Sequence, residues 1–239
     1  MTQTMPKAMV LAAGLGTRMR PLTEHLPKPL VKVAGVALID RALDWLAASG
    51  VEEAVVNSHY LAPLLEAHLA KRKTPKIHVS YEAIVLETGG GVKQALPFLG
   101  DKPFFVVNSD TICIDGKVPA LHRLMQSWDD TVDALLLVHK TADAVGFSGP
   151  GDFFMDKDGS LRRRLEAPSA PFVFTGVQML HPRLFHHSPD SVFSLNVLYN
   201  HDMRKDGTLM RVRGLLHDGD WLHVGTPQEL QQVESWLAD

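Results

Sequence analysis

A glycine-rich stretch near the amino end holds the residues best suited to bind phosphate groups. It reads Leu11-Ala-Ala-Gly-Leu-Gly-Thr-Arg-Met-Arg-Pro-Leu-Thr23 and follows a short apolar run. Its two glycines permit a tight turn whose backbone N–H groups can surround phosphate oxygens, and Arg18 adds a planar set of donors. Lys28 follows between two prolines, which stiffen the backbone that carries its ammonium group. Because Gly-x-Gly also occurs in ordinary turns, this stretch suggests a triphosphate site without establishing one.

Two later segments add glycines and a carboxylate. Glu87-Thr-Gly-Gly-Gly91 stands before an expected helix, where its glycines would let the backbone approach a flat base or a ribose; a flexible loop is the alternative. The apolar run from Phe104 ends in Asn108-Ser-Asp110. Ligands of open α/β sheets lie at the carboxyl ends of strands, so we expect Asp110 to hold Mg²⁺ against phosphate oxygens. An aspartate in this place is also common as a simple turn residue.

Several other kinds of site are not indicated. The dinucleotide-binding fingerprint needs a third glycine where Met19 stands, and the P-loop sequence Gly-Lys-Ser/Thr is absent. The twelve histidines form no H-E-x-x-H pair, so the pattern does not predict zinc. There is no Gly-x-Ser-x-Gly elbow, and Cys113 is most simply a small buried residue. The sequence therefore favours the binding and neutralisation of phosphates over nucleophilic catalysis.

The elements that must position these residues alternate between strands and helices, the pattern of a sheet covered by helices. We expect strands at about 7–13, 53–59, 76–82, 103–109, 132–139 and 172–180. An amphipathic stripe predicts a helix from Leu38 that stops at Gly50, and further helices begin near residues 61, 91 and 119. Thr226-Pro-Gln-Glu229 has the capping pattern of a last helix, while 141–170 is the least regular stretch.

The composition fits a single domain of 239 residues with one large core, since 45% of its residues are hydrophobic. A net charge of -3 provides no general basic surface for nucleic acid, although residues 1–32 hold five basic side chains against one acid. A single cysteine excludes an internal disulfide and suits a reducing cytoplasm. Short apolar runs predict neither a membrane span nor a signal peptide.

In order and spacing, these segments together resemble the family of sugar-1-phosphate nucleotidyltransferases. That family opens with L-A-A-G-x-G-T-R followed by P-K-P, which stand here without gaps as Leu11 to Arg18 and Pro27 to Pro29. The resemblance covers nearly the whole chain and implies an α/β fold, a Rossmann-like α/β/α sandwich with a mostly parallel mixed sheet. It is closer to short bacterial uridylyltransferases acting on N-acetylmuramate 1-phosphate in cell-wall recycling, whose glycine motif reads E-T-G-G-G as Glu87 to Gly91 does.

The resemblance implies a role for each matching position. Residues 1–115 would bind the nucleotide and residues 116–239 the sugar phosphate, within one domain. The catalytic residues would be Arg18 and Lys28 on the phosphates and Asp110 on Mg²⁺. Further nucleotide contacts would come from Leu11, Ala12, Ala13, Gly14, Gly16, Thr17, Asn57, Thr88 and Gly89. The sugar-phosphate contacts would come from Asn108, Gly151, Glu166, Thr175 and Gly176.

Two positions depart from the family pattern. The motif E-K-P stands here as Glu166-Ala-Pro168 without its lysine; the arginines at 162–164 could substitute, although an arginine run is more often a solvated face. The distal magnesium carboxylate of W-x-D-x-G-T is replaced by His223. Because Mg²⁺ prefers oxygen ligands, metal binding would rest on Asp110, phosphates and water, or His223 would favour Mn²⁺. A core or hydrogen-bonding histidine is the simpler interpretation of His223.

The implied reaction joins an NTP, here UTP, to a sugar 1-phosphate by direct attack on the α-phosphorus, and it needs no general base because the attacking phosphate is already ionised. The alternatives are a mannose-1-phosphate guanylyltransferase or a cytidylyltransferase, a non-catalytic nucleotide-sugar sensor, and a glycosyltransferase with a D-x-D motif, of which Asn108-Ser-Asp110 has only the second acid. We expect no nucleic-acid or membrane partner, and a monomer or small homo-oligomer.

Overall fold

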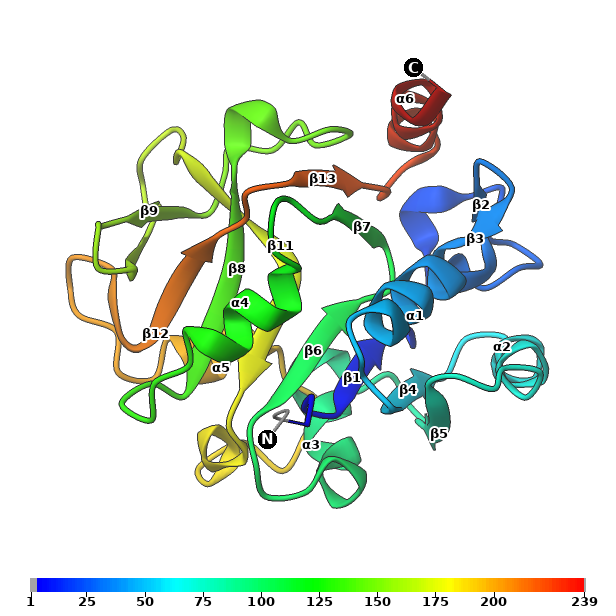
Figure 1. Cartoon of the computed structure of the whole chain (residues 1–239), viewed down its shortest axis with the longest axis horizontal. Helices are drawn as coiled ribbons and strands as arrows, with labels where there is room; N and C mark the ends of the chain where they lie inside the picture. The colour runs from blue at the N-terminus through cyan, green and yellow to red at the C-terminus, as the bar shows by residue number, and fades with distance from the viewer. Residues whose placement is uncertain (1–3, 239) are drawn as a thin grey trace.

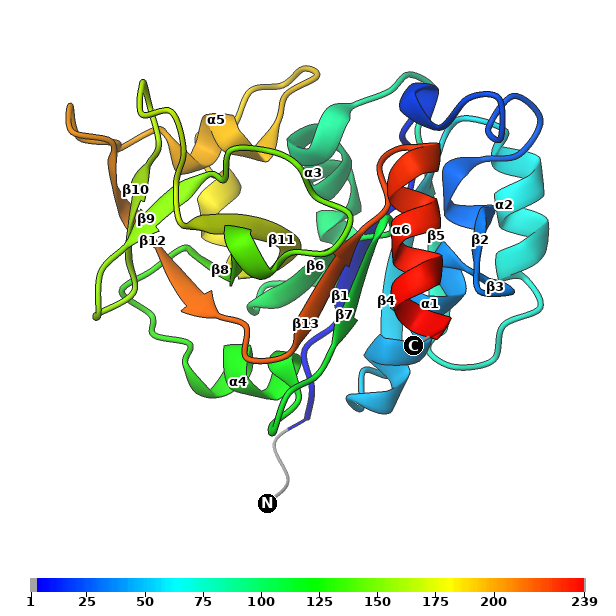
Figure 2. The same cartoon turned by 90° about the horizontal axis from the view of Figure 1, so that it is seen from above.

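The chain forms a nine-stranded mixed sheet with helices on both faces (Figures 1 and 2). The computed structural model describes residues 4–238. Across the sheet the strands are β5 (Lys76–Tyr81), β4 (Glu53–Ser58), β1 (Ala8–Leu11), β6 (Phe104–Asn108), β11 (Phe172–Leu180), β8 (Ala134–Lys140), β12 (Thr208–Leu216), β10 (Ser160–Arg163) and β9 (Phe153–Met155). The first four run parallel, β12 runs parallel to β8, and β11 is antiparallel to both neighbours. The expected Rossmann-like α/β class is confirmed.

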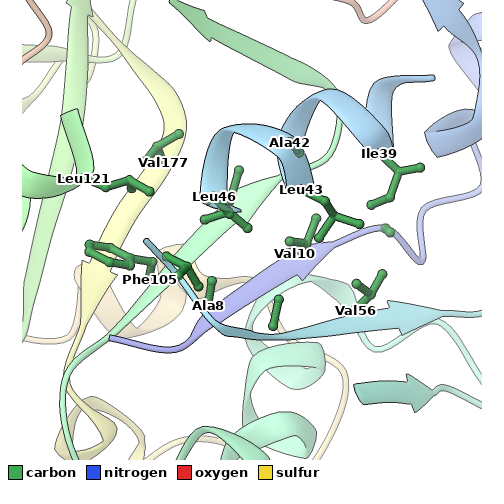
Figure 3. Close-up of a cluster of buried hydrophobic side chains, with 14 of the residues drawn as sticks. Ala8, Val10, Ile39, Ala42, Leu43, Leu46, Val56, Phe105, Leu121 and Val177 are labelled. Carbon is green, nitrogen blue, oxygen red and sulfur yellow. The ribbon is translucent and has the colours of Figure 1, made fainter. Parts of the chain in front are cut away.

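Apolar side chains on both faces of the sheet build two cores. Successive residues of a strand point to opposite faces, so Ala8 and Val10 pack on one side while Met9 packs on the other. The first side is covered by α1 (Leu38–Ala48), α2 (Ala62–Leu69) and α4 (Ala120–Gln126), and the second by α3 (Glu87–Leu99) and α5 (Leu195–Tyr199). Figure 3 shows the first core, where α1 lays its apolar stripe of Ile39, Ala42, Leu43 and Leu46 over the sheet.

The last helix, α6 (Pro227–Ala238), packs against residues from the first forty positions of the sequence. Its predicted start is confirmed, because the Thr226 hydroxyl accepts a hydrogen bond from the Glu229 N–H at 3.2 Å. Val233 of α6 packs in a small core with residues of β2 (Lys32–Val33) and β13 (Asp220–His223). Two short pairings complete this region, namely β2 with β3 (Val36–Ala37) and β13 with β7 (Thr111–Ile114). Figure 2 shows α6 (red) beside β2 and β3.

All six expected strands and all expected helices are present, with two corrections to the predicted layout. The helix expected near residue 91 begins at Glu87, so the three glycines lie inside its first turns and do not precede it. β12 was not expected, and the irregular stretch contains β9 and β10. Within the described part of the chain, no helix has both the length and the apolar character needed to cross a membrane.

Candidate active site

A cavity of about 200 Å³ opens where β1, β4 and β6 end, at the edge where ligands of parallel sheets are expected. Since the three strands are parallel and adjacent, their carboxyl ends bring distant parts of the sequence together. The lining residues are Leu11, Ala12, Ala13, Gly14, Lys28, Pro29, Asn57, Glu82, Val85, Glu87, Thr88, Asn108, Ser109 and Asp110. Nine of the residues proposed from the sequence are therefore neighbours in this cavity, with Lys28 and Asp110 among them.

The glycine-rich stretch forms the tight turn that its sequence predicts. Gly16 has a φ of 63°, and its carbonyl accepts a hydrogen bond from the buried Thr23 hydroxyl at 2.7 Å. A side chain at Gly16 would place its Cβ 3.1 Å from the Cβ of Lys28, so the turn lies directly against the lysine. Thr17 and Arg18 follow as exposed residues of a single 3₁₀ turn, Thr17–Met19, whose Met19 is buried, and neither of the two lines the cavity.

Lys28 and Asp110 form an ion pair at the cavity wall. The Lys28 Nζ donates to Asp110 Oδ2 at 2.7 Å, and both side chains are mostly shielded from solvent. Burial alone would raise the pKa of Asp110, but the charge and hydrogen bond of Lys28 outweigh it, so the pKa lies below its ordinary value. Asp110 is therefore an ionised carboxylate that faces the cavity, as a metal ligand must be.

A buried chain of hydrogen bonds holds the floor of the cavity. The Ala12 N–H donates to Asn57 Oδ1 at 2.6 Å, Asn57 Nδ2 donates to Glu82 Oε1 at 2.7 Å, and the Leu86 N–H donates to Glu82 Oε2 at 2.9 Å. Asn57 and Glu82 are 3% and 1% exposed, so every lost partner would leave a buried polar group unsatisfied. Glu82 was missed by the sequence analysis, although its place at the end of the expected 76–82 strand was an available signal.

The glycines of α3 allow close packing between this helix and its neighbours. A Cβ at Gly91 would lie 2.7 Å from Glu82 Oε1 and 2.9 Å from Asn57 Nδ2, and one at Gly89 would clash with the ring of Phe193. Gly89 does not line the cavity, whereas its neighbour Thr88 does. The Thr88 hydroxyl also accepts a hydrogen bond from the Leu195 N–H at 2.9 Å.

Asn108 lies over a glycine of the neighbouring strand. Gly176 has a φ of 81°, and a Cβ there would lie 2.8 Å from Asn108 Nδ2, so only glycine lets β11 pass this close. The adjacent Thr175 is fully buried and donates its hydroxyl proton to the Leu137 carbonyl at 2.8 Å. The structure thus brings Asn108 and Gly176 together and directs the Thr175 side chain into the sheet.

His223 lies next to this site without lining the cavity. In the β13–β7 pairing it stands opposite Thr111, the residue after Asp110. Its Nε2 is 3.8 Å from Glu229 Oε2, and its ring stacks on Trp221. Burial lowers the pKa of His223 despite the nearby carboxylates of Asp110 and Glu229, which favours a neutral imidazole. Its buried Nδ1 has no hydrogen-bond partner among the described residues.

A metal ion at this site would have few protein ligands. Residues 4–238 contain no cluster of three or more histidine, cysteine, aspartate or glutamate side chains suited to hold one. Of the two magnesium carboxylates in the family pattern, only the one at Asp110 is present in this sequence. Three other side chains converge around Gly225: a Cβ there would lie 2.6 Å from His223 Nε2, 2.7 Å from Glu229 Oε2 and 3.3 Å from Arg18 Nη1. Any further metal ligands would have to come from a substrate or from water.

The remaining predicted residues lie at a second recess. This recess is lined by Gly151, Asp152, Arg163, Arg164, Leu165, Asn196, Asn200 and Met203. Arg164 ties its rim together, since it donates to the Ala167 carbonyl at 2.6 Å and to the Gly151 carbonyl at 3.2 Å. Glu166 is an exposed residue of the same turn. Gly151 and Glu166 are thus brought near each other, but not into the cavity that holds Lys28 and Asp110.

The sequence and the fold were compared with known proteins. Residues 7–238 match the family described as "Nucleotidyl transferase". The chain is 46% identical over 245 aligned positions, covering 100% of both chains, to N-acetylmuramate alpha-1-phosphate uridylyltransferase of Caulobacter vibrioides. It is 36% identical to the protein of that name in Neisseria meningitidis, with 96% of this chain and 97% of the relative covered.

The fold agrees with these sequence matches. A UDP-glucose pyrophosphorylase solved with UDP-glucose superposes with a TM-score of 0.77 over 98% of both chains, at 17% identity. At that identity the likeness concerns the fold alone. The full-length sequence matches carry the assignment, and the chain belongs to the nucleotidyl transferase family, among its sugar-1-phosphate nucleotidyltransferases.

Proposed function

We propose that this enzyme condenses UTP with N-acetylmuramate 1-phosphate to give UDP-N-acetylmuramate and pyrophosphate. The observation that carries the proposal is the Lys28–Asp110 pair, 2.7 Å apart in the cavity that the turn from Leu11 to Gly14 lines, in a chain matched end to end by a uridylyltransferase for that sugar. The reaction forms one bond from a sugar-phosphate oxygen to the α-phosphorus and breaks the bond to the β-phosphate. Positioning and charge neutralisation are then the whole task of the protein.

Each side chain has a separate part in this proposal. The turn from Leu11 to Gly14 donates backbone N–H groups to the nucleotide, and Asn57 holds that turn through the Ala12 N–H. Lys28 neutralises the α-phosphate, and Arg18 draws charge from the departing pyrophosphate. Thr88 faces the base, and Asn108 above Gly176 contacts the ribose or sugar. Residues 1–115 would thus supply the nucleotide half of one domain and residues 116–239 the sugar half.

The residues present fit a divalent metal ion held through substrate oxygens. Nucleotidyl transferases generally use such an ion, and Asp110 offers an ionised carboxylate at the cavity wall. Mg²⁺ commonly binds one or two carboxylates plus substrate phosphates and water, so a single carboxylate is sufficient. When bound, the metal would neutralise phosphate charge. Because His223 stands beside Asp110, Mn²⁺ is the alternative ion.

A substrate screen tests the proposal. Pyrophosphate release is measured with each of four NTPs against N-acetylmuramate, N-acetylglucosamine, glucose and mannose 1-phosphates, with Mg²⁺ or Mn²⁺. We expect the largest kcat/KM for UTP with N-acetylmuramate 1-phosphate. A preference for GTP with mannose 1-phosphate would instead support the guanylyltransferase alternative, which a relative from Dictyostelium discoideum, 28% identical over 93% of this chain, represents. A cytoplasmic location, where the single cysteine stays reduced, is part of the same proposal.

A further inference from the structure

Arg163 is a partly buried cation that no described carboxylate pairs with. It stands at the end of β10, where it faces the same side as the buried Leu161, and its guanidinium lies 4.8 Å from the centre of the Phe153 ring. Its Nε donates to Asn200 Oδ1 at 3.0 Å and its Nη2 to Asn196 Oδ1 at 2.7 Å, so both contacts are to neutral amides. No salt bridge joins it to any acid in residues 4–238.

A partly buried charge without an ion partner destabilises the folded protein unless a bound anion neutralises it. Burial lowers the pKa of Arg163, which means that its charge is less well solvated than that of a surface arginine. Asp152 lines the same recess and its charge partly offsets the effect of burial on the pKa of Arg163, but it makes no ion pair with Arg163 and directs Oδ2 to the Phe174 N–H at 2.9 Å. A shielded charge held by two amides, at an open recess that Arg163 itself lines, is suited to bind an anion.

One hydrogen bond and one peptide bond connect the recess to the catalytic cavity. Thr88 lines the cavity and accepts a hydrogen bond from the Leu195 N–H, and the next residue, Asn196, lines the recess and holds Arg163. On the other side, Asp152 of the recess is hydrogen-bonded to β11, the strand that places Gly176 under Asn108. A sugar seated at Asn108 would therefore extend its outer substituents toward Arg163.

From this geometry we infer that Arg163 is the specificity-determining residue for the acidic side chain of the sugar, binding the lactyl carboxylate of N-acetylmuramate. The inference rests on the proposed function. N-acetylmuramate differs from N-acetylglucosamine only by a lactyl ether on the sugar ring, whose carboxylate is the one anionic group outside the phosphate. A planar guanidinium fixed by two amides matches a carboxylate in shape as well as charge. Contact with the sugar phosphate would instead affect both sugars alike.

The experiment measures how Arg163 and the carboxylate depend on each other. Isothermal titration calorimetry gives the Kd of UDP-N-acetylmuramate and UDP-N-acetylglucosamine for the wild type, Arg163→Gln and Arg162→Gln. Arg162 is the matched control, because it is exposed on the opposite side of β10 and stacks on Phe154. We expect Arg163→Gln to weaken UDP-N-acetylmuramate about tenfold or more, equal to about 1.4 kcal/mol, while the other three comparisons change less than about twofold.

Two further measurements keep the outcome decisive. With N-acetylmuramate 1-phosphate, Arg163→Gln should raise KM and leave kcat near the wild-type value. If this variant does not fold, the wild type alone is titrated with UDP-N-acetylmuramate and with its lactyl methylamide, which lacks the charge and should bind about tenfold more weakly. Equal loss for both sugars, no loss at all, or equal binding of acid and amide would overturn the inference. Wild-type turnover of N-acetylmuramate 1-phosphate, measured first, upholds the proposed function whichever of these results is obtained.

Discussion

Replacing Gly91 with alanine should damage both stability and UTP binding, although alanine is the better helix former. Gly91 lies within α3 and faces the hydrogen-bonded pair of Asn57 and Glu82. The added Cβ would meet Glu82 Oε1 at 2.7 Å and Asn57 Nδ2 at 2.9 Å, well inside normal contact distance. Neither group can move freely, because Glu82 also binds the Leu86 N–H and Asn57 also binds the Ala12 N–H.

The expected magnitude follows from three opposing contributions. Alanine in place of glycine favours the helix by about 1 kcal/mol. Overpacking costs about 1–3 kcal/mol, and loss of one hydrogen bond to the charged Glu82 carboxylate costs about 1.5–3 kcal/mol. The net loss of unfolding free energy is therefore about 1.5–5 kcal/mol, or a Tm lower by about 3–20 °C in a chain of this size. The same displacement would shift the Ala12 N–H, so the KM for UTP should rise while the fold persists.

Thermal unfolding followed by circular dichroism, together with the KM for UTP, tests this reasoning. Gly90→Ala is the matched control, since it makes the same change one residue earlier and its Cβ would meet the Leu86 side chain at 3.0 Å and the Ser191 carbonyl oxygen at 3.5 Å, but neither Asn57 nor Glu82. It should leave the KM for UTP unchanged. If Gly91→Ala kept the wild-type Tm and KM, the buried Asn57–Glu82 pair would not be holding the nucleotide turn as described.

Three further predictions concern charge and reactivity. Lys28→Ala and Asp110→Ala should each lower kcat about a hundredfold or more in the pyrophosphate-release assay, with circular dichroism unchanged, because each removes a charge next to the reacting phosphates. Near-normal turnover in either would remove the mechanism. Burial alone would raise the pKa of Asp133, but Arg211 and Arg183 hold it below the ordinary value. Its ion pairs therefore stabilise the fold above about pH 4, and this stabilisation is lost as the pH falls through the pKa of the folded state. Asp133→Asn should therefore cost about 1–2 kcal/mol at pH 7 in urea unfolding and progressively less below about pH 4; a constant difference would refute this. Cys113 is partly buried, which raises the pKa of its thiol, so iodoacetamide at pH 8 should label the native protein much more slowly than the denatured one; equal rates would contradict the structure.

Local patterns were sufficient to predict most of the sheet. Strands such as 104–108 are continuous apolar runs bounded by polar residues, and α1 has a clear apolar stripe, so neighbours in sequence determine both. β12 escaped prediction because its exposed and buried residues, such as Met210 and Val212, do not follow a clean alternation. The glycines of α3 were misplaced for a related reason. Three glycines disfavour a helix locally, and only packing against Glu82 and Phe193 makes them suitable there.

The candidate site was predictable where residue types suited to bind phosphate or metal stand at or beside the end of an expected strand. Lys28, Asn108 and Asp110 stand at or beside such ends, and the parallel sheet places them in one cavity. Glu82 has the same position but no motif around it, so its type alone did not distinguish it from a surface acid. Thr175 shows the opposite case. Its family motif suggested a ligand, yet the structure gives its hydroxyl a backbone partner in the sheet.

Arg163 shows why specificity is harder to read from a sequence than the reaction class. The residues proposed to bind phosphate lie close together along the chain or at strand ends. Because all NTPs share the same phosphate groups, these residues can be recognised from their types and positions in the sequence. Arg163 differs from Arg162 and Arg164 in the direction that β10 gives it and in its hydrogen bonds to Asn196 of α5 and to Asn200 just after that helix, both more than thirty residues away. Those contacts are fixed by tertiary packing, so the run of three arginines gave no means to choose among them. If the sugar-selective effect is confined to Arg163, then the pairing of β10 with β9 and the hydrogen bond to α5 are what direct one of three neighbouring arginines to the substrate.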